Sequence, residues 1–200
     1  MAAEYTIIEA VSRALQRVLT DALAVIDSDV PPVAAPHNLQ PPPSGQPPVL
    51  TLFLYEVTED YTMRNRDSTR ELKAAGGRER YEISRPPLAL ELRYLVTAWA
   101  NDRATEQLMI GRTLQVLYEH QIRRGANLDP PLDLPLLSIT LAPLTLEERT
   151  RVWWAIQQPY RLSLNYEVRA IDVDVSGQNP DLAAPVRERQ LDGFLPEDRR

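Results

Sequence analysis

The stretch Tyr160–Val175, Tyr-Arg-Leu-Ser-Leu-Asn-Tyr-Glu-Val-Arg-Ala-Ile-Asp-Val-Asp-Val, decides the fold class. Up to Ala170, apolar and polar side chains alternate, and successive side chains of a β-strand point to opposite faces. The alternation predicts a long strand with one face against a core and the other towards solvent. After Ala170 the apolar residues change parity, which moves the apolar set to the other face of the strand. We therefore expect a bulge or a change of partner near Ala170.

Three other segments have the residue pattern of strands. Val49–Glu59 carries apolar side chains on both parities, which is typical of a central strand covered on both faces. Leu88–Trp99 places apolar side chains on one parity and Glu91, Arg93 and Thr97 on the other. Leu136–Ala142 is a shorter apolar run. Together with Tyr160–Val175, these segments predict a sheet.

Helices are predicted from apolar residues that recur at steps of three and four. Glu4–Asp27 has the clearest such pattern, and Ala104–Gln121 follows the possible caps Asp102 and Thr105. Four residues give the second helix its expected buried stripe: Leu108, Ile110, Leu114 and Leu117.

A third helix is expected after Thr145, which can cap it, with Glu147 and Glu148 in the first turn, where the helix dipole favours anions. Its expected buried side chains are Leu146, Trp153 and Ile156. Gly111, inside the second helix, suggests a close approach between that helix and the sheet. Five aromatic residues are expected in the core: Tyr55, Tyr94, Trp99, Trp153 and Tyr166.

Three polar or proline-rich segments separate or follow these elements. Asp29–Pro48 contains Pro31-Pro32, Pro41-Pro42-Pro43 and Pro47-Pro48 and is interpreted as a crossing loop, because proline fits neither a helix interior nor a sheet interior. Residues 60–84 are predicted to form a long exposed connection, and residues 176–200 an extended C-terminal tail. The expected organisation is therefore one domain, residues 1–175, and the tail. Its fold class is α+β, with a mixed, mostly antiparallel sheet on which the N-terminal helix and two further helices pack.

Composition excludes several classes of protein. The chain has 200 residues, of which 44% are apolar and 25% charged, as in ordinary globular proteins. It has no cysteine, which excludes disulfides and thiolate chemistry. A net charge of −6, with acids and bases interspersed, argues against nucleic acid as a partner. No apolar run reaches the length of about 18 residues that a membrane span needs, and no secretory signal is expected at the N-terminus.

No catalytic or metal-binding motif is found. The two histidines, His37 and His120, lack a second ligand at metal spacing, and His120 is interpreted as a cation at a helix end. Asp172–Gly177 matches the first six positions of an EF-hand loop, but Ala183 stands where the bidentate acid belongs. The neighbouring acids Glu147 and Glu148 point to different sides of a helix and cannot flank one scissile bond. We predict that the chain is not an enzyme and holds no cofactor or metal.

Four blocks of sequence, in order, resemble a known family. The first is Leu52-Phe-Leu-Tyr-Glu-Val57 followed by Met63-Arg-Asn65, and the second is Pro86–Trp99. The third is Gln107–Leu117, and the fourth runs from Trp153 to Val168. These blocks are similar to those of the Pvc16-type N-terminal domain family of contractile phage-tail-like particles. The resemblance covers about residues 5–175.

The resemblance implies a structural cap, or tail terminator, of a contractile injection system. Such a protein forms a ring, expected to be a hexamer, that closes the far end of the inner tube and anchors the last sheath ring. The implied partners are other copies of the chain, the tube protein and the sheath protein, with neither nucleic acid nor membrane. The implied location is the bacterial cytoplasm during assembly and then the particle, whether it stays inside the cell or is released.

The resemblance and the predicted exposed segments also indicate candidate contact residues. Arg64 and Asn65 match a family block and fall in the predicted exposed connection, where they either touch a neighbouring subunit or cap the turn after a strand. The long connection and the tail are the segments expected to meet partners, because sheath subunits of such particles join by exchanging strands. The full set of candidate interface residues is Arg64, Asn65, Arg66, Arg70, Arg187, Arg189, Leu191 and Phe194.

Two other functions remain open from the residues alone. A binding adaptor would present the proline-rich segment to a partner domain. Deleting Pro36–Pro47 would abolish the binding of an adaptor, whereas a terminator would still form rings. A small hydrolase or nucleotide-binding enzyme would need a motif, such as a clustered acid pair, that the chain lacks.

Overall fold

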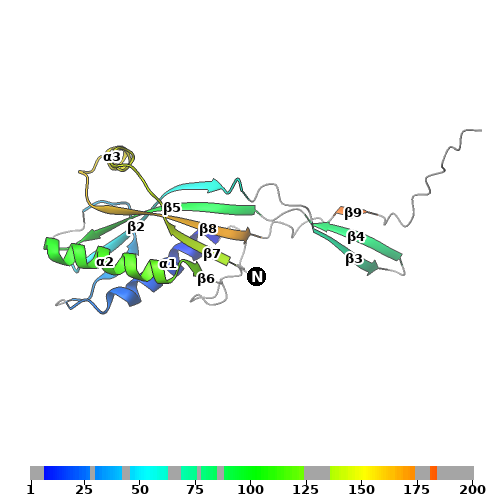
Figure 1. The fold of residues 1–200 in the computed structure, drawn as a ribbon, viewed down its shortest axis with the longest axis horizontal. Helices are drawn as coiled ribbons and strands as arrows, with labels where there is room; N and C mark the ends of the chain where they lie inside the picture. The colour runs from blue at the N-terminus through cyan, green and yellow to red at the C-terminus, as the bar shows by residue number, and fades with distance from the viewer. Residues whose placement is uncertain are drawn as a thin grey trace, which may run out of the picture. The chain divides into compact units, whose positions relative to one another are not determined.

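The computed structural model describes residues 7–27, 30–41, 46–62, 69–75, 78–84, 88–123, 136–173 and 181–183, which are coloured in Figure 1. For residues 69–75, 78–84, 123, 136, 171–173 and 181–183 it describes the backbone alone. The chain divides into two compact units. Unit 1 comprises Met1–Asn65 and Pro87–Val175, and unit 2 comprises Arg66–Pro86 and Ser176–Arg200. The predicted organisation into residues 1–175 and 176–200 stays a prediction.

Unit 1 is built on a six-stranded mixed sheet with the order β1-β2-β5-β8-β7-β6. Neighbouring strands are antiparallel except β1 and β2, which are parallel. The α+β class predicted from the sequence is confirmed. Its elements are α1 (Ile7–Leu23), β1 (Val33–Pro36), β2 (Val49–Glu59), β5 (Leu88–Trp99), α2 (Arg103–Glu119), β6 (Ile122–Arg123), β7 (Leu136–Leu141), α3 (Leu146–Ala155) and β8 (Ser163–Val173).

Helices cover both faces of this sheet, with α1 and α2 on one face and α3 on the other (Figure 1). The larger core lies under α1 and α2. Leu19 and Leu23 of α1 pack there with Met109 and Leu117 of α2 and with one parity of the strands, such as Leu92. The smaller core lies under α3 and consists of Leu39, Leu95, Trp99 and Trp153.

The aromatic residues expected in the core are buried, apart from Tyr55. Tyr94, Trp99, Trp153 and Tyr166 are each at most 6% exposed, whereas Tyr55 is half-buried. The Tyr94 hydroxyl lies 2.8 Å from Ser12 Oγ, which itself donates to the carbonyl of Ile8. Because Ser12 has a single hydroxyl proton, Tyr94 is the donor in their contact. Burial raises the pKa of Tyr94 to about 12, although the hydrogen bond to Ser12 lowers it, and burial also raises the pKa of Tyr166 to about 12.

Both shifts predict a loss of stability in alkali. A phenol whose pKa is about 12 in the folded chain and 10 in the unfolded chain keeps its proton up to a higher pH when the chain is folded. Its contribution to stability is therefore complete below pH 10 and is lost as the pH rises from 10 through 12. Urea unfolding measured between pH 8 and 12 should show this fall, and Tyr94→Phe should flatten it. An equally steep fall in the Tyr94→Phe variant would contradict the assignment to Tyr94.

The bulge expected near Ala170 is confirmed. Leu90 pairs with Ala170 and Leu88 pairs with Val173, so one residue of β5 between these pairs faces two of β8. On its other edge β8 pairs with β7 without interruption, Leu137 with Ala170 and Leu136 with Ile171. The prediction that the polar side chains of this strand face solvent is only partly right, because Ser163 and Asn165 are buried beneath α3. Leu162, predicted to be buried, lies before the strand begins and is 52% exposed.

The proline-rich segment contains a strand that the sequence analysis missed. β1 forms the edge of the sheet, and its register runs from Val33 opposite Val49 to Pro36 opposite Leu52. Proline is tolerated there because an edge strand has one side without ladder hydrogen bonds. The chain then leaves the edge: Leu39 adopts a φ of 60° and is fully buried in the smaller core.

Residues 60–84 are not only a connection, as the sequence predicted. Within unit 2, β3 (Thr69–Ala75) and β4 (Arg78–Ser84) form an antiparallel pair, and β9 (Asp181–Ala183), inside the predicted tail, pairs with β4. The segment Thr-Arg-Glu-Leu-Lys-Ala-Ala of β3 has too few apolar residues to show a strand period. Its strand state depends on its partner strand instead.

Two residues predicted to face the core lie in solvent. Leu108 of α2 is 59% exposed and Leu146 of α3 is 61% exposed. In α2, the buried row runs through Met109, Thr113 and Val116, which turns Leu108 outwards. Helical spacing alone did not determine which of two adjacent apolar rows faces the sheet.

Gly111 does not mark a close approach between α2 and the sheet. Apart from the adjacent residues and the nearby backbone of its own helix, a Cβ at this position would meet no atom within 4 Å. Because glycine in a helix interior costs about 1 kcal/mol relative to alanine, Gly111→Ala should raise the free energy of unfolding of the monomer by about 1 kcal/mol. Urea unfolding at low protein concentration measures this change. An unchanged or lower stability would show that the position meets a constraint within the chain.

Candidate interaction surfaces

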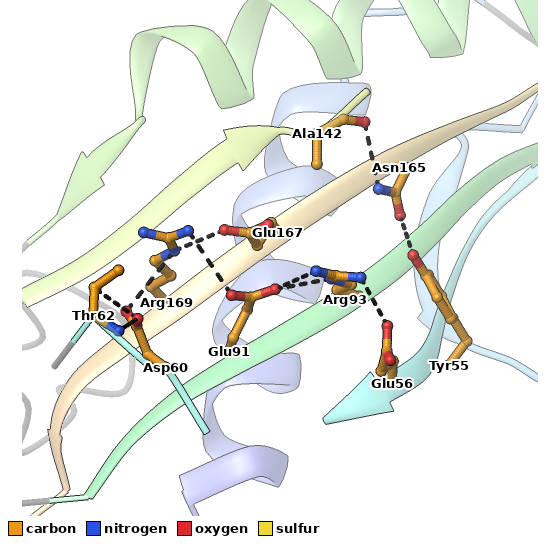
Figure 2. A network of polar contacts seen from close by, with 10 residues as sticks. All are labelled: Tyr55, Glu56, Asp60, Thr62, Glu91, Arg93, Ala142, Asn165, Glu167 and Arg169. Atoms are coloured by element: carbon orange, nitrogen blue, oxygen red, sulfur yellow. Dashed lines mark hydrogen bonds and ion pairs between the residues drawn. The ribbon is translucent and has the colours of Figure 1, made fainter. Parts of the chain in front are cut away.

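Polar side chains of β2, β5 and β8 converge on one face of the sheet (Figure 2). It is the face that carries α3, because Glu91 and Arg93 share the parity of Trp99, which packs against Trp153. Arg93 of β5 lies between two carboxylates: its Nε donates to Glu91 Oε1 at 2.8 Å, and its Nη1 donates to Glu56 Oε2 of β2 at 3.0 Å. Burial alone lowers the pKa of Arg93, but the hydrogen bond and charge of Glu91 and the charge of Glu56 raise it overall. The guanidinium therefore stays charged and holds two strands together.

A second arginine extends the network to β8. Arg169 Nε donates to Glu167 Oε1 at 2.7 Å, and its guanidinium lies 3.8 Å from Glu91 Oε2 and 3.9 Å from Asp60 Oδ2. Asp60, which is buried, accepts from the backbone and hydroxyl of Thr62 at 2.9 and 2.6 Å. Burial lowers the pKa of Arg169, but Glu167, Asp60 and Glu91 raise it overall.

These side chains form one charge lattice, defined as Glu56, Asp60, Glu91, Arg93, Glu167 and Arg169, in which four carboxylates surround two guanidiniums. Both guanidiniums already bind carboxylates, so the lattice is not built to bind an anion. Its excess of carboxylate suits a basic partner surface. Glu56, Arg93 and Arg169 each keep about two fifths of their side chains exposed, so a neighbouring molecule can reach the lattice.

Asn165 forms a second, separate set of hydrogen bonds on the same face. Tyr55 Oη donates to Asn165 Oδ1 at 2.8 Å, and Asn165 Nδ2 donates to the carbonyl of Ala142 at 3.4 Å. Burial is the main cause of the raised pKa of Tyr55. The amide thus links β2, β8 and the end of β7, which fixes the position from which the chain enters α3.

The sequence around α3 places one side of this helix against the sheet and the other in solvent. Thr145 caps α3 as predicted, and with Glu148 it forms a capping box: Thr145 Oγ1 accepts from the Glu148 amide at 3.2 Å, and the Thr145 amide donates to Glu148 Oε2 at 2.8 Å. Trp153 is buried, with its Nε1 3.3 Å from Ser163 Oγ. Its neighbour Trp154, about 100° further around the helix, is 81% exposed.

The solvent side of α3 carries an apolar surface. Leu146, Thr150 and Trp154 follow one another at steps of four and line a shallow, open depression of about 630 Å³. Glu147 and Arg151, which form an ion pair at 2.7 Å, lie along its side. Exposed tryptophan is rare on surfaces that remain in solvent and common at the centre of protein interfaces. This surface is therefore the clearest candidate for a contact with protein.

A second charged cluster ties α2 to the sheet. Glu106, in the first turn of α2, forms ion pairs with Arg103 at 2.8 Å and with Arg161. The guanidinium of Arg161 also lies over the ring of Trp99, 4.2 Å from its centroid. Glu106 and Arg161 are largely buried, so this cluster holds elements in place and is not a contact surface.

The edge of β2 is a third candidate surface. β1 pairs with β2 only from Val49 to Leu52, and the amide of His37 reaches the carbonyl of Leu52 at 3.1 Å. Within the described part of the chain, no strand pairs with this edge from Leu54 to Glu59. An open edge of this kind can accept an extended segment of another chain.

All eight contact residues predicted from the sequence fall outside the described side chains. Seven of them lie outside the described residues: Arg64, Asn65, Arg66, Arg187, Arg189, Leu191 and Phe194. Arg70 lies in β3, where only the backbone is described. Trp154 is not among the contact residues predicted from the sequence, although two adjacent tryptophans in a helix on a sheet cannot both face the core.

The described residues contain no arrangement typical of a metal site or a membrane span. No three of their His, Asp and Glu side chains lie where they could hold a metal ion together. The EF-hand-like segment Asp172–Gly177 falls outside the described side chains. None of the described helices combines the length and the apolar character that crossing a bilayer requires. His120 is the C-cap of α2, at the helix end where it was expected.

Two solved structures share this fold. One is the sheath/tube terminator of the PVC extracellular contractile injection system in its extended state, with a TM-score of 0.59 and 20% identity over 91% of this chain and 61% of that chain. The other is the tube-terminating cap of the anti-feeding prophage (AFP), with a TM-score of 0.55 and 17% identity over 92% of this chain and 58% of that chain. The match thus spans about three fifths of the length of each.

Sequence comparison gives the family. None of the curated proteins compared with the chain matches it. Residues 10–188 match the family described as the Pvc16 N-terminal domain, and this match includes every element from β1 to β9 and most of α1. The resemblance stated from the four sequence blocks is confirmed, and the chain belongs to the Pvc16 N-terminal domain family.

Proposed function

We propose that the chain is a structural terminator of a contractile injection system. The observation that carries this proposal is the agreement between family membership over residues 10–188 and a fold shared with two proteins that are described as terminators of a tube. The terminator role is that of those two proteins, and it is extended to this chain as a proposal because identity is at most 20%.

The described surfaces suit such a role. A terminator must end a growing tube by shape, edge pairing and charge, and needs no catalytic group. Three surfaces offer contacts of these kinds. The exposed stripe of α3 offers shape, the open edge of β2 offers edge pairing, and the charge lattice offers charge. The exposed stripe of α3 and the charge lattice lie on the same face of the sheet, and the lattice includes Glu56 of β2, the strand that carries the open edge.

In detail, we propose a ring of six copies that closes the inner tube and anchors the terminal sheath ring. Head-to-tail contacts between identical copies give a closed ring when the rotation between them closes. The partners are then other copies of the chain, the tube protein and the sheath protein. The tail 176–200 remains a proposed contact segment, and eight residues remain proposed contacts: Arg64, Asn65, Arg66, Arg70, Arg187, Arg189, Leu191 and Phe194. Assembly takes place in the bacterial cytoplasm, and the protein then becomes part of the particle.

The adaptor reading is less consistent with the fold. It requires the proline-rich segment to be displayed to a partner, but Val33–Pro36 forms an edge strand and Leu39 is buried in the smaller core. Deleting Pro36–Pro47 would also remove Leu39, so the deletion would damage the fold and would not separate the two functions. A suitable variant replaces only prolines outside β1, such as Pro41.

Native mass spectrometry of the full chain, alone and with its tube protein, tests the proposed ring. We expect one closed species, most simply of six copies, either free or only when tubes are present. The Pro41→Ala variant should form the same species. A strict monomer under both conditions would contradict the ring and the terminator role together, whereas loss of tube binding in Pro41→Ala with rings retained would favour the adaptor.

A further inference from the structure

Arg149 of α3 is a half-buried cation that has almost no partner among the described residues. Its Nη1 donates to the carbonyl of Ser163 at 3.4 Å, which is long for a hydrogen bond. Its Nε is buried and has no acceptor, and no carboxylate of the described residues pairs with it. Because a guanidinium carries five N–H donors, most of the capacity of Arg149 to bind an acceptor is unused.

The other half-buried arginines of the described part of the chain are better satisfied. Three of them form ion pairs with carboxylates: Arg93, Arg161 and Arg169. The fourth, Arg112, donates to the carbonyl of Ala22 at 3.2 Å, in the last turn of α1, where the helix dipole favours a cation. Arg149 lies one turn from the N-terminus of α3, the positive end of that helix, so the dipole does not compensate its charge.

Arg149 and Ser163 both line a pocket of about 230 Å³. Four apolar residues form much of its remaining wall: Leu141, Pro143, Leu144 and Leu164. Pockets that hold a whole small molecule usually measure about 300–1,000 Å³. The size of this pocket therefore suits a single side chain.

The pocket arises where β8 extends past the end of β7. β8 begins at Ser163, but its pairing with β7 begins only at Tyr166, opposite Leu141. At the start of β8, the guanidinium of Arg149 binds the strand carbonyl that a neighbouring strand would otherwise bind. One long hydrogen bond holds the guanidinium there, which leaves its positive charge to an acceptor from outside the chain.

The chemistry of the pocket favours a carboxylate as that acceptor. A guanidinium and a carboxylate match in shape and form short, charge-assisted hydrogen bonds. Apolar walls keep water away from such a pair and strengthen it. Arg149 is the one cation among the described residues that line the pocket, whereas phosphate is commonly held by several donors.

From these observations we propose that the pocket binds an acidic side chain, glutamate or aspartate, of a partner protein, and that its carboxylate pairs with Arg149. An apolar residue beside that acid packs on Leu141, which is 49% exposed. The inference goes beyond the proposed function, because it names the side chain that a partner must present.

Titration of a short peptide into the ¹⁵N-labelled full chain tests the pocket, with the Nε–H signal of Arg149 followed by NMR. The probe is acetyl-Leu-Glu-Leu-amide, and acetyl-Leu-Gln-Leu-amide is the control without charge. We expect a saturable shift of the Arg149 signal with the acidic peptide, at least about tenfold weaker binding of the control, and no shift of Arg13. An Arg149 signal that stays in place, or that moves equally with both peptides, would overturn the inference.

Arg149→Gln tests whether assembly uses the pocket. It should raise the dissociation constant for another copy, the tube protein or the sheath protein by about tenfold or more, because it removes one charge of the pair. The controls Arg13→Gln, at a side chain 55% exposed, and Val25→Glu, at a residue 70% exposed, make the same change in net charge and should bind as the wild type does. If Arg149→Gln does not fold, Arg149→Lys takes its place, since lysine keeps the charge but loses the planar fork.

The outcomes separate this inference from the proposed function. Unchanged affinity of the Arg149 variant for all three partners would overturn the inference and leave the terminator role standing. A wild-type chain that binds neither other copies nor the tube protein would overturn the terminator role, and the peptide titration would still decide whether the pocket binds a carboxylate.

Discussion

Trp153→Ala is expected to lower the free energy of unfolding by about 3–5 kcal/mol, the usual cost of removing a buried tryptophan. Trp153 is 1% exposed and is the part of α3 that reaches the smaller core. Its ring lies 6.5 Å from that of Trp99, at an interplanar angle of 58°. The cavity left by alanine would remove the main contact that holds α3 on the sheet.

Trp154→Ala is the matched control, since it changes the same residue type one position further along the same helix. Because Trp154 is 81% exposed, its replacement should change the stability of the monomer by less than about 0.5 kcal/mol. Urea unfolding of both variants at low protein concentration makes the comparison. A loss of less than 1 kcal/mol for Trp153→Ala, or equal losses for both, would contradict the placement of α3.

The second large effect is expected at Glu106. Glu106→Gln should lower the free energy of unfolding by about 2–3 kcal/mol, because it leaves the guanidinium of Arg161 without a charged partner. The cost is less than that of breaking a fully buried pair, because about a quarter of the Arg161 side chain reaches solvent. The pair ties the first turn of α2 to the segment that enters β8.

A double-mutant cycle separates this pair from other contacts of Glu106. Arg161→Gln is combined with Glu106→Gln, and the coupling energy is measured by urea unfolding. We expect the double variant to lose less than the sum of the single losses. The surface pair Glu147–Arg151, of which each side chain is about three quarters exposed, is the control and should show a coupling below about 1 kcal/mol. Additive losses at Glu106 and Arg161 would contradict their interaction.

The central strands could be predicted from the sequence because burial on two faces leaves a strong pattern. Val49–Glu59 and Leu88–Trp99 have the bounds that the residues indicated, and the bulge after Ala170 follows from a change of apolar parity. The Thr145 cap was also predictable, since a capping box is a local arrangement of two side chains.

Features that depend on distant partners were missed. β1 owes its strand state to the edge of β2, and β3 and β4 owe theirs to each other, so neither needs an apolar period of its own. The charge lattice required the register that places Arg93 opposite Glu167, which no local pattern contains. The outward positions of Leu108 and Leu146 depend on the orientation in which each helix packs.

Electron microscopy of tubes grown with and without the full chain tests the terminator role most directly. We predict a ring at one end of each tube and, as the chain concentration rises, shorter tubes that stop growing once capped. Tubes grown with the Val25→Glu variant should look the same. Tubes of unchanged length with bare ends, or a chain that binds along the whole tube wall, would contradict the account.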